Sequence, residues 1–121
     1  MKDVPMKRYT SMRIGGPAKL LLYPADRTDL LAMVSRLQDS GTPYRFLGNG
    51  TNIIVSDNGI DDALIRIARM SRLHFTKTKD GAIAEVGGGF PLKRFIGECA
   101  KRGFGGLEKL YWIPGSVGGG I

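Results

Sequence analysis

Leu47-Gly48-Asn49-Gly50-Thr51-Asn52 is the stretch that decides how this sequence is interpreted. It lies between two short apolar segments, 44–47 and 53–55, which are both predicted to be strands. Glycine has no Cβ and tolerates positive φ angles, so this loop can bring backbone N–H groups close to phosphate oxygens. The Thr51 hydroxyl and the Asn52 amide would add donors. The stretch therefore predicts a diphosphate site, although Asn-Gly is also typical of a plain hairpin turn.

Two other glycine clusters occur, and none of the three matches a standard phosphate-binding fingerprint. The first has Ile53 where G-x-G-x-x-G needs its third glycine, and a predicted strand where that motif needs a helix. The second, Gly87–Gly89, precedes a predicted helix and can also be a simple strand-to-helix turn. The third, 113–120, has the spacing of a Walker loop but Ile121 in place of its lysine. A glycine linker is an alternative for this third cluster, although its apolar lead-in disfavours a linker.

The first half of the chain predicts strands around one helix. An apolar strand over 18–23 ends at Pro24, and Asp26 or Thr28 can cap a helix that continues to about Ser40. Strands at 44–47, 53–55 and 63–67 follow, so the helix is expected to link two parallel strands. The apolar face of this helix is predicted from its spacing to consist of Leu30, Leu31, Val34 and Leu37.

From about residue 70 the pattern changes to a hairpin followed by a second helix. Lys79-Asp80-Gly81 is a turn signal between strands at 73–78 and 82–86. Pro91 is placed at the first position of a helix that runs to about Arg102, where Gly103 caps it. The residue pattern therefore divides the chain near residue 70. The apolar face of this second helix is predicted to consist of Leu92, Phe95, Ile96, Cys99 and Ala100.

Composition narrows the class of protein. The 121 residues are 42% hydrophobic and 24% charged, which is typical of a folded domain rather than a disordered chain. Met1–Thr10 has no apolar core of a secretory signal, and no apolar run is long enough to span a membrane. Cys99 is the single cysteine and His74 the single histidine, so a disulfide framework or zinc cluster is excluded and the cytosol is the expected compartment. The net charge of +7 suits an anionic ligand.

Four motifs occur together in the order and spacing of one family. Taken together they resemble the N-terminal part of bacterial UDP-N-acetylenolpyruvoylglucosamine reductases, also called UDP-N-acetylmuramate dehydrogenases, and the resemblance covers nearly the whole chain. The motifs are Thr10-Ser11-Met12-Arg13-Ile14-Gly15-Gly16-Pro17-Ala18, Leu47-Gly48-Asn49-Gly50-Thr51-Asn52, Gly106-Leu107-Glu108 and Ile113-Pro114-Gly115-Ser116-Val117-Gly118-Gly119.

The resemblance implies the FAD-binding fold of vanillyl-alcohol oxidase and p-cresol methylhydroxylase. This is an α+β fold in which non-covalently bound FAD lies between a small α/β subdomain and a second, more antiparallel one. The resemblance implies that residues 1–70 form the first subdomain and residues 71–121 the beginning of the second. The first glycine loop would hold the diphosphate, the third would line the flavin end, and the second would be a turn beside the cofactor. The cofactor-binding residues implied are Leu47, Gly48, Asn49, Gly50, Thr51, Asn52, Gly88, Ile113, Pro114, Gly115, Ser116, Val117, Gly118 and Gly119. No catalytic residue or metal ligand is implied.

The family's activity, carried over by resemblance, is that of a flavin oxidoreductase. NADPH is the reductant, UDP-N-acetylglucosamine enolpyruvate the UDP-sugar substrate and UDP-N-acetylmuramate the product. The reaction belongs to cytoplasmic peptidoglycan synthesis, and through it to cell shape and division. The substrate-binding domain and the family's general acid are expected outside residues 1–121, so Ser116 is assigned to the cofactor loop and this segment alone is expected to be inactive. No nucleic-acid or membrane partner is expected.

Two other functions remain open at this point. A stand-alone nucleotide-binding module would keep the phosphate loop and need no second domain. A small basic nucleic-acid-binding domain is the other alternative, although Phe75 is the one aromatic residue within its basic run, which is little for base stacking. The basic residues of that run are Arg66, Arg69, Arg72, His74, Lys77 and Lys79.

Overall fold

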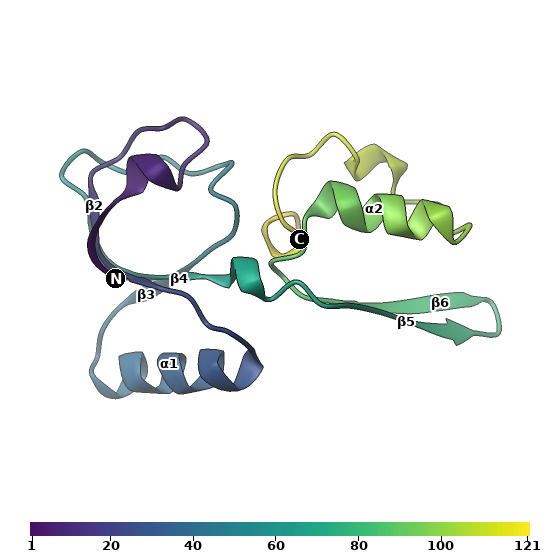
Figure 1. The fold of residues 1–121 in the computed structure, drawn as a ribbon, viewed down its shortest axis with the longest axis horizontal. Helices are drawn as coiled ribbons and strands as arrows, with labels where there is room; N and C mark the ends of the chain where they lie inside the picture. Colours follow the sequence, from purple (N-terminus) through teal and green to yellow (C-terminus); the bar gives the residue numbers. More distant parts are fainter.

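The computed structural model describes all residues from 1 to 121 and contains two sheets with one helix beside each. The four-stranded sheet and the two-stranded hairpin lie at opposite ends of the molecule, joined by a short helical turn (Figure 1). The elements are β1 (Lys2–Pro5), β2 (Pro17–Leu22), α1 (Arg27–Asp39), β3 (Tyr44–Leu47), β4 (Ile60–Arg66), β5 (Leu73–Thr78), β6 (Gly81–Val86) and α2 (Leu92–Lys101), with 3₁₀ turns at Met6–Arg8, Ile67–Arg69, Glu108–Leu110 and Val117–Gly119.

The four-stranded sheet has the order β1-β2-β4-β3. Strands β2, β4 and β3 are parallel, and β1 pairs antiparallel with β2. The prediction that a helix links two parallel strands is therefore confirmed, with β4 inserted between the two. Strand β1 was not predicted, because four residues with Val4 as their single buried side chain give no pattern to detect. Because β2, β4 and β3 are parallel, the loop after β3 lies at the carboxyl edge of these strands, where α/β sheets commonly bind ligands.

The predicted strand over 53–55 is wrong. These residues pair with no strand and form irregular chain between β3 and β4. Their side chains nevertheless alternate as in a strand: Val55 is buried in the main core, whereas Ile54 is 73% exposed. The apolar alternation thus reflects burial of a loop against the core, and the first glycine cluster is followed by irregular chain.

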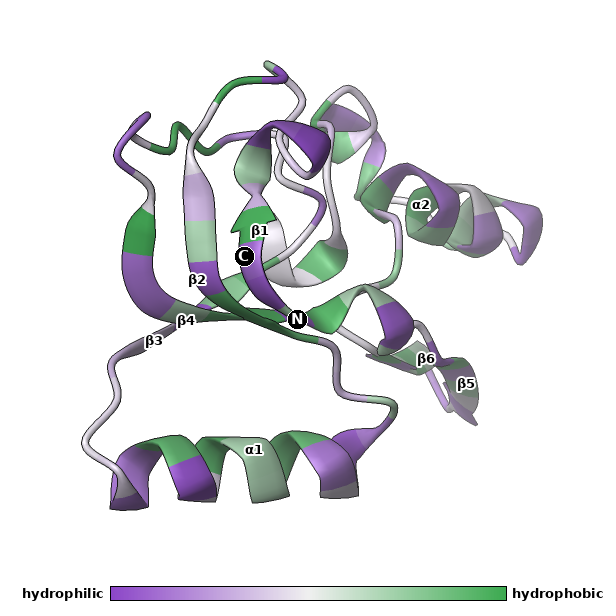
Figure 2. Cartoon of the chain, turned by 60° about the vertical axis from the view of Figure 1, so that its left-hand side comes forward, coloured by the Kyte–Doolittle hydropathy of each residue, from purple (hydrophilic) through white to green (hydrophobic).

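Helix α1 covers one face of this sheet. The Asp26 carboxylate accepts a hydrogen bond from the Asp29 N–H and caps the helix, and Gly41 adopts the positive φ of +62° expected of a C-terminal cap. Leu37 is buried against the sheet, and Figure 2 shows the hydrophobic side of α1 turned toward the strands. Leu31 was predicted to share this face but is 57% exposed, because it lies one position to the side of the stripe.

The second half contains the predicted hairpin and helix. Strands β5 and β6 pair over their whole length, from Leu73↔Val86 to Thr78↔Gly81. Pro91 caps α2 instead of occupying its first turn, and Ala100 is exposed instead of buried. The buried face of α2 contacts Val117 of the third glycine cluster through a small core with Phe90. The division of the chain at residue 70 stays a prediction. No helix of the structure is both long and apolar enough to span a bilayer.

Candidate functional site

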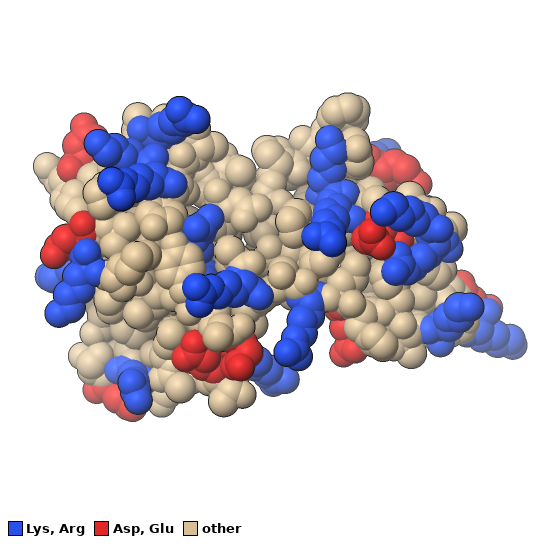
Figure 3. Space-filling view, viewed as in Figure 1, with Lys and Arg blue, Asp and Glu red and all other residues tan.

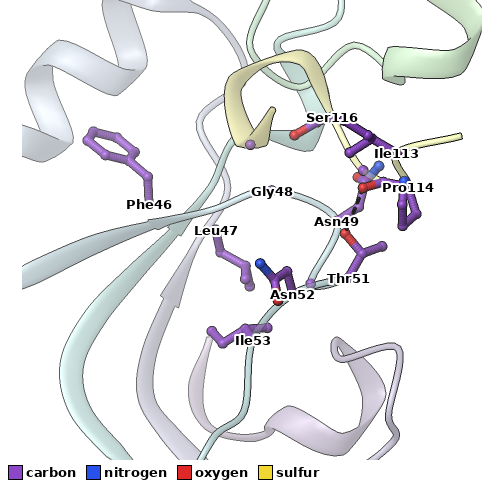
Figure 4. Close-up of a pocket in the computed structure, with 13 residues that line it drawn as sticks. Phe46, Leu47, Gly48, Asn49, Thr51, Asn52, Ile53, Ile113, Pro114 and Ser116 are labelled. Carbon is purple, nitrogen blue, oxygen red and sulfur yellow. Dashed lines mark hydrogen bonds between the residues drawn. The ribbon is translucent and has the colours of Figure 1, made fainter. Parts of the chain in front are cut away.

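The first and third glycine clusters, far apart in the sequence, form one cleft of about 540 Å³. Residues 46–53 supply one wall, and Ile113–Ser116 with Gly119 supply the other (Figure 4). The Thr51 hydroxyl donates a hydrogen bond of 3.3 Å to the Pro114 carbonyl oxygen, which links the two walls. The volume lies within the ordinary range of small-molecule sites.

The polar surface of the cleft consists mostly of unused donors. None of the five backbone N–H groups from Gly48 to Asn52 donates a hydrogen bond within the protein, and the same holds for Gly115 and Ser116. The Ser116 Oγ is buried and has no hydrogen-bond partner. No Asp, Glu, Lys, Arg or His side chain lines the cleft. Successive free N–H groups without a competing carboxylate are the chemistry of an anion site.

Close packing favours glycine at two positions of the first cluster, and at Gly50 the backbone conformation does so as well. Gly50 has φ +66°, and a methyl group at this position would overlap the carbonyl oxygen of Tyr9. A Cβ on Gly48 would lie 2.6 Å from the Ser116 Oγ, inside van der Waals contact. In Figure 4 the Ser116 side chain points toward the Gly48 segment. A side chain at Gly48 would therefore push against the opposite wall, whereas one at Gly50 would push the loop away from Tyr9.

Three residues predicted to bind the cofactor lie behind the cleft rather than in it. Gly118 donates a hydrogen bond of 2.9 Å to the Gly88 carbonyl oxygen, and the two backbones touch. Val117 is 8% exposed and belongs to the core under α2. These three residues hold the third cluster in place. Sequence reasoning missed Phe46 and Ile53, which line the cleft and could have been found as the immediate neighbours of the loop.

An aromatic and basic cluster lies at the same edge of the sheet. Arg66 ends β4 directly opposite Leu47, and its guanidinium lies 5.1 Å from the centroid of the Tyr9 ring. Arg66 also donates to the Tyr23 hydroxyl at 3.2 Å, while its buried Nε has no partner. Burial raises the pKa of Tyr23, the neighbouring Tyr9 side chain raises it further, and Arg66 opposes both effects.

The arrangement of the basic run does not favour a nucleic-acid-binding surface. Figure 3 shows Lys and Arg scattered among acidic residues over both ends of the visible face, without one continuous basic stripe. Phe75 stacks on Phe104 at 6.1 Å between centroids and is covered by the Arg102 guanidinium at 4.5 Å, so it is not free to stack on a base. Neither this function nor a stand-alone nucleotide module is favoured.

Comparison with known proteins identifies the family. The family described as "FAD binding domain" matches residues 18–121. The chain belongs to this FAD-binding family. Its donor-lined cleft fits the cofactor that gives the family its name, because FAD carries a diphosphate that needs many donors and no opposing carboxylate.

Relatives of this FAD-binding chain include annotated reductases. It is 40% identical over 121 residues to UDP-N-acetylenolpyruvoylglucosamine reductase of Geobacter metallireducens, and 42% identical over 117 residues to the protein of that name from Syntrophotalea carbinolica. These matches cover 100% and 97% of this chain but only 39% and 38% of the relatives. The chain therefore spans about two fifths of the length of the curated relatives it matches.

A solved structure supports the same α+β FAD-binding fold. UDP-N-acetylenolpyruvylglucosamine reductase (MurB) from Thermus caldophilus superposes with a TM-score of 0.69 at 35% sequence identity. The match covers 94% of this chain and 38% of that structure's chain. The predicted fold class is thus confirmed for both halves of the chain.

Proposed function

We propose that this chain is the FAD-binding part of a reductase that uses NADPH to convert UDP-N-acetylglucosamine enolpyruvate to UDP-N-acetylmuramate. The proposal places the protein in the cytoplasm, in peptidoglycan synthesis. Relatives of this kind match nearly the whole chain. The observation that carries the proposal is the row of free N–H groups from Gly48 to Asn52 facing the third glycine cluster across one cleft.

The protein's own contribution in this proposal is to hold and orient the cofactor. The free N–H groups of the first glycine cluster donate to the diphosphate, and the Ser116 hydroxyl adds a donor from the opposite wall. Phe46 and Ile113 offer apolar surface at the two walls for the ring systems. FAD, when bound, supplies the hydride-transfer chemistry. The UDP-sugar substrate is supported by the relatives' names, and NADPH is carried over from the family that the motifs resemble.

Replacing Ser116 with alanine tests the site at its buried, unpartnered hydroxyl. We expect FAD affinity to fall about tenfold, since one hydrogen bond to a charged group is lost. The free energy of unfolding of the cofactor-free protein should stay the same or rise, because the hydroxyl has no partner to lose. FAD affinity is measured by quenching of flavin fluorescence, and stability by urea unfolding.

Ser40→Ala is the matched control for this measurement. The Ser40 hydroxyl donates to the Leu37 carbonyl oxygen at the end of α1, far from the cleft in the fold. Its loss should lower stability slightly and leave FAD affinity unchanged. If Ser116→Ala binds FAD as tightly as the wild type, this hydroxyl does not contact the cofactor.

A second prediction concerns proton supply. The reduction needs a proton donor at the substrate, and the cleft contains no titratable side chain. Loss of a general acid alone typically costs about 10²–10⁴ in rate. Residues 1–121 assayed alone with FAD and NADPH should therefore show no oxidation of NADPH that depends on UDP-N-acetylglucosamine enolpyruvate. Substrate-dependent turnover above a protein-free control would contradict this expectation.

A further inference from the structure

The segment Tyr9–Ser11 lies directly behind the first glycine cluster. The Ser11 N–H donates to the Gly50 carbonyl oxygen at 2.9 Å, and the Ser11 hydroxyl donates to the Thr51 carbonyl oxygen at 3.3 Å. The Tyr9 carbonyl group packs so closely on Gly50 that no Cβ fits between them. Two successive carbonyl groups of the loop are therefore held on the side of Ser11.

This arrangement decides where the neighbouring N–H groups point. In a trans peptide the C=O and N–H bonds point in opposite directions, and the chain contains no cis peptide. The peptide that directs the Gly50 carbonyl group toward Ser11 directs the Thr51 N–H away from it. The next peptide does the same for the Asn52 N–H. Both N–H groups lack an acceptor in the protein, and both residues line the cleft.

The segment that carries Ser11 is itself fixed at two points. The Arg66 guanidinium covers the Tyr9 ring, and the Tyr9 and Tyr23 rings lie 6.4 Å apart. Next to Tyr9, Thr10 is 6% exposed, and its hydroxyl donates to the Ile14 carbonyl oxygen at 2.8 Å. The segment Tyr9–Ser11 is thus held in place by its neighbours, so the two hydrogen bonds of Ser11 can orient the loop.

We propose that Ser11 is a positioning residue for the cofactor loop. By holding the carbonyl groups of Gly50 and Thr51, it presents the next two N–H groups to the ligand's diphosphate. Ser11 does not touch the ligand in this arrangement and acts only through the loop. The proposal rests on the proposed function, since it assumes that the cleft takes a diphosphate.

The test compares FAD with riboflavin, which lacks both the diphosphate and the adenosine of FAD. Full-length protein with Ser11→Ala, Ser11→Thr or Ser71→Ala is titrated with FAD and with riboflavin, which has the flavin ring but no phosphate. Ser11→Ala should weaken FAD binding about fivefold, as expected for the loss of one oriented donor, and leave riboflavin binding unchanged. Ser11→Thr keeps the hydroxyl and should restore FAD affinity. Ser71 is an exposed serine whose hydroxyl makes no hydrogen bond, so its alanine variant should match the wild type.

The other possible results of these titrations would each contradict one part of the proposal. An equal loss of FAD and riboflavin affinity in Ser11→Ala would show a merely structural role, and unchanged FAD affinity would remove Ser11 from the site. If Ser11→Thr fails to restore binding, the hydroxyl is not the group responsible. Wild-type protein that binds riboflavin as tightly as FAD would overturn the diphosphate site itself, and with it the proposed function.

Discussion

Replacing Gly50 with alanine is expected to abolish tight FAD binding and to lower the free energy of unfolding by about 2–4 kcal/mol. Two costs combine at this position. The residue has φ +66°, which L-residues rarely adopt, and the added methyl group would overlap the Tyr9 carbonyl oxygen. The loop would have to move away from the segment Tyr9–Ser11, and the N–H groups of the loop would lose their common direction. Urea unfolding and FAD titration measure the two effects.

Gly41→Ala separates the cost of the backbone conformation from the cost of the steric overlap. Gly41 has nearly the same φ, +62°, but nothing lies within 4 Å of the Cβ it would gain. This variant should lose about 1 kcal/mol from the backbone conformation alone and keep its FAD affinity. If Gly50→Ala behaves like Gly41→Ala in both measurements, the close approach to Tyr9 contributes nothing, and our description of the loop is wrong.

Ile96→Ala is expected to cost about 2–5 kcal/mol, as usual for truncating a buried isoleucine. Ile96 is 6% exposed and packs in the small core with Phe90, Leu92 and Val117. Because Val117 belongs to the third glycine cluster, a cavity at Ile96 should also loosen one wall of the cleft. We therefore expect weaker FAD binding at temperatures where the variant is still folded.

Leu31→Ala is the matched helix-surface control. Leu31 lies on α1 and is 57% exposed, so the same kind of truncation should change the free energy of unfolding by no more than about 0.5 kcal/mol. Denaturant unfolding of both variants makes the comparison. A loss below about 1 kcal/mol for Ile96→Ala would show that α2 does not pack as described.

Much of the local structure could be predicted from the sequence, because local signals were sufficient. Asp26 and Gly41 mark the ends of α1, and the turn signal Lys79-Asp80-Gly81 places the hairpin of β5 and β6. The errors occurred where tertiary packing decides. Residues 53–55 have a strand pattern but pair with no strand and pack on the core as a loop, and Leu31 follows the helical period but faces solvent.

The candidate site could be predicted only in part for the same reason. Local pattern marked each glycine cluster, and only the resemblance to a family suggested that the first and third belong to one site. The contact between Gly50 and Tyr9 could not be foreseen, because it joins residues 41 positions apart without a motif that links them. Gly88 was assigned to the cofactor from sequence; in the structure its carbonyl oxygen accepts a hydrogen bond from the Gly118 N–H, and it does not line the cleft.

The absence of charged side chains from the cleft has a consequence for how the site tolerates mutation. Main-chain atoms are the same in every amino acid except proline, so exchanging Asn49, whose side chain makes no hydrogen bond in the protein, for another small residue leaves the N–H donors in place. The donors are lost when the path of the backbone changes, as at Gly50. In evolutionary terms, selection at such a site would act on the shape of the loop far more than on the chemistry of its side chains.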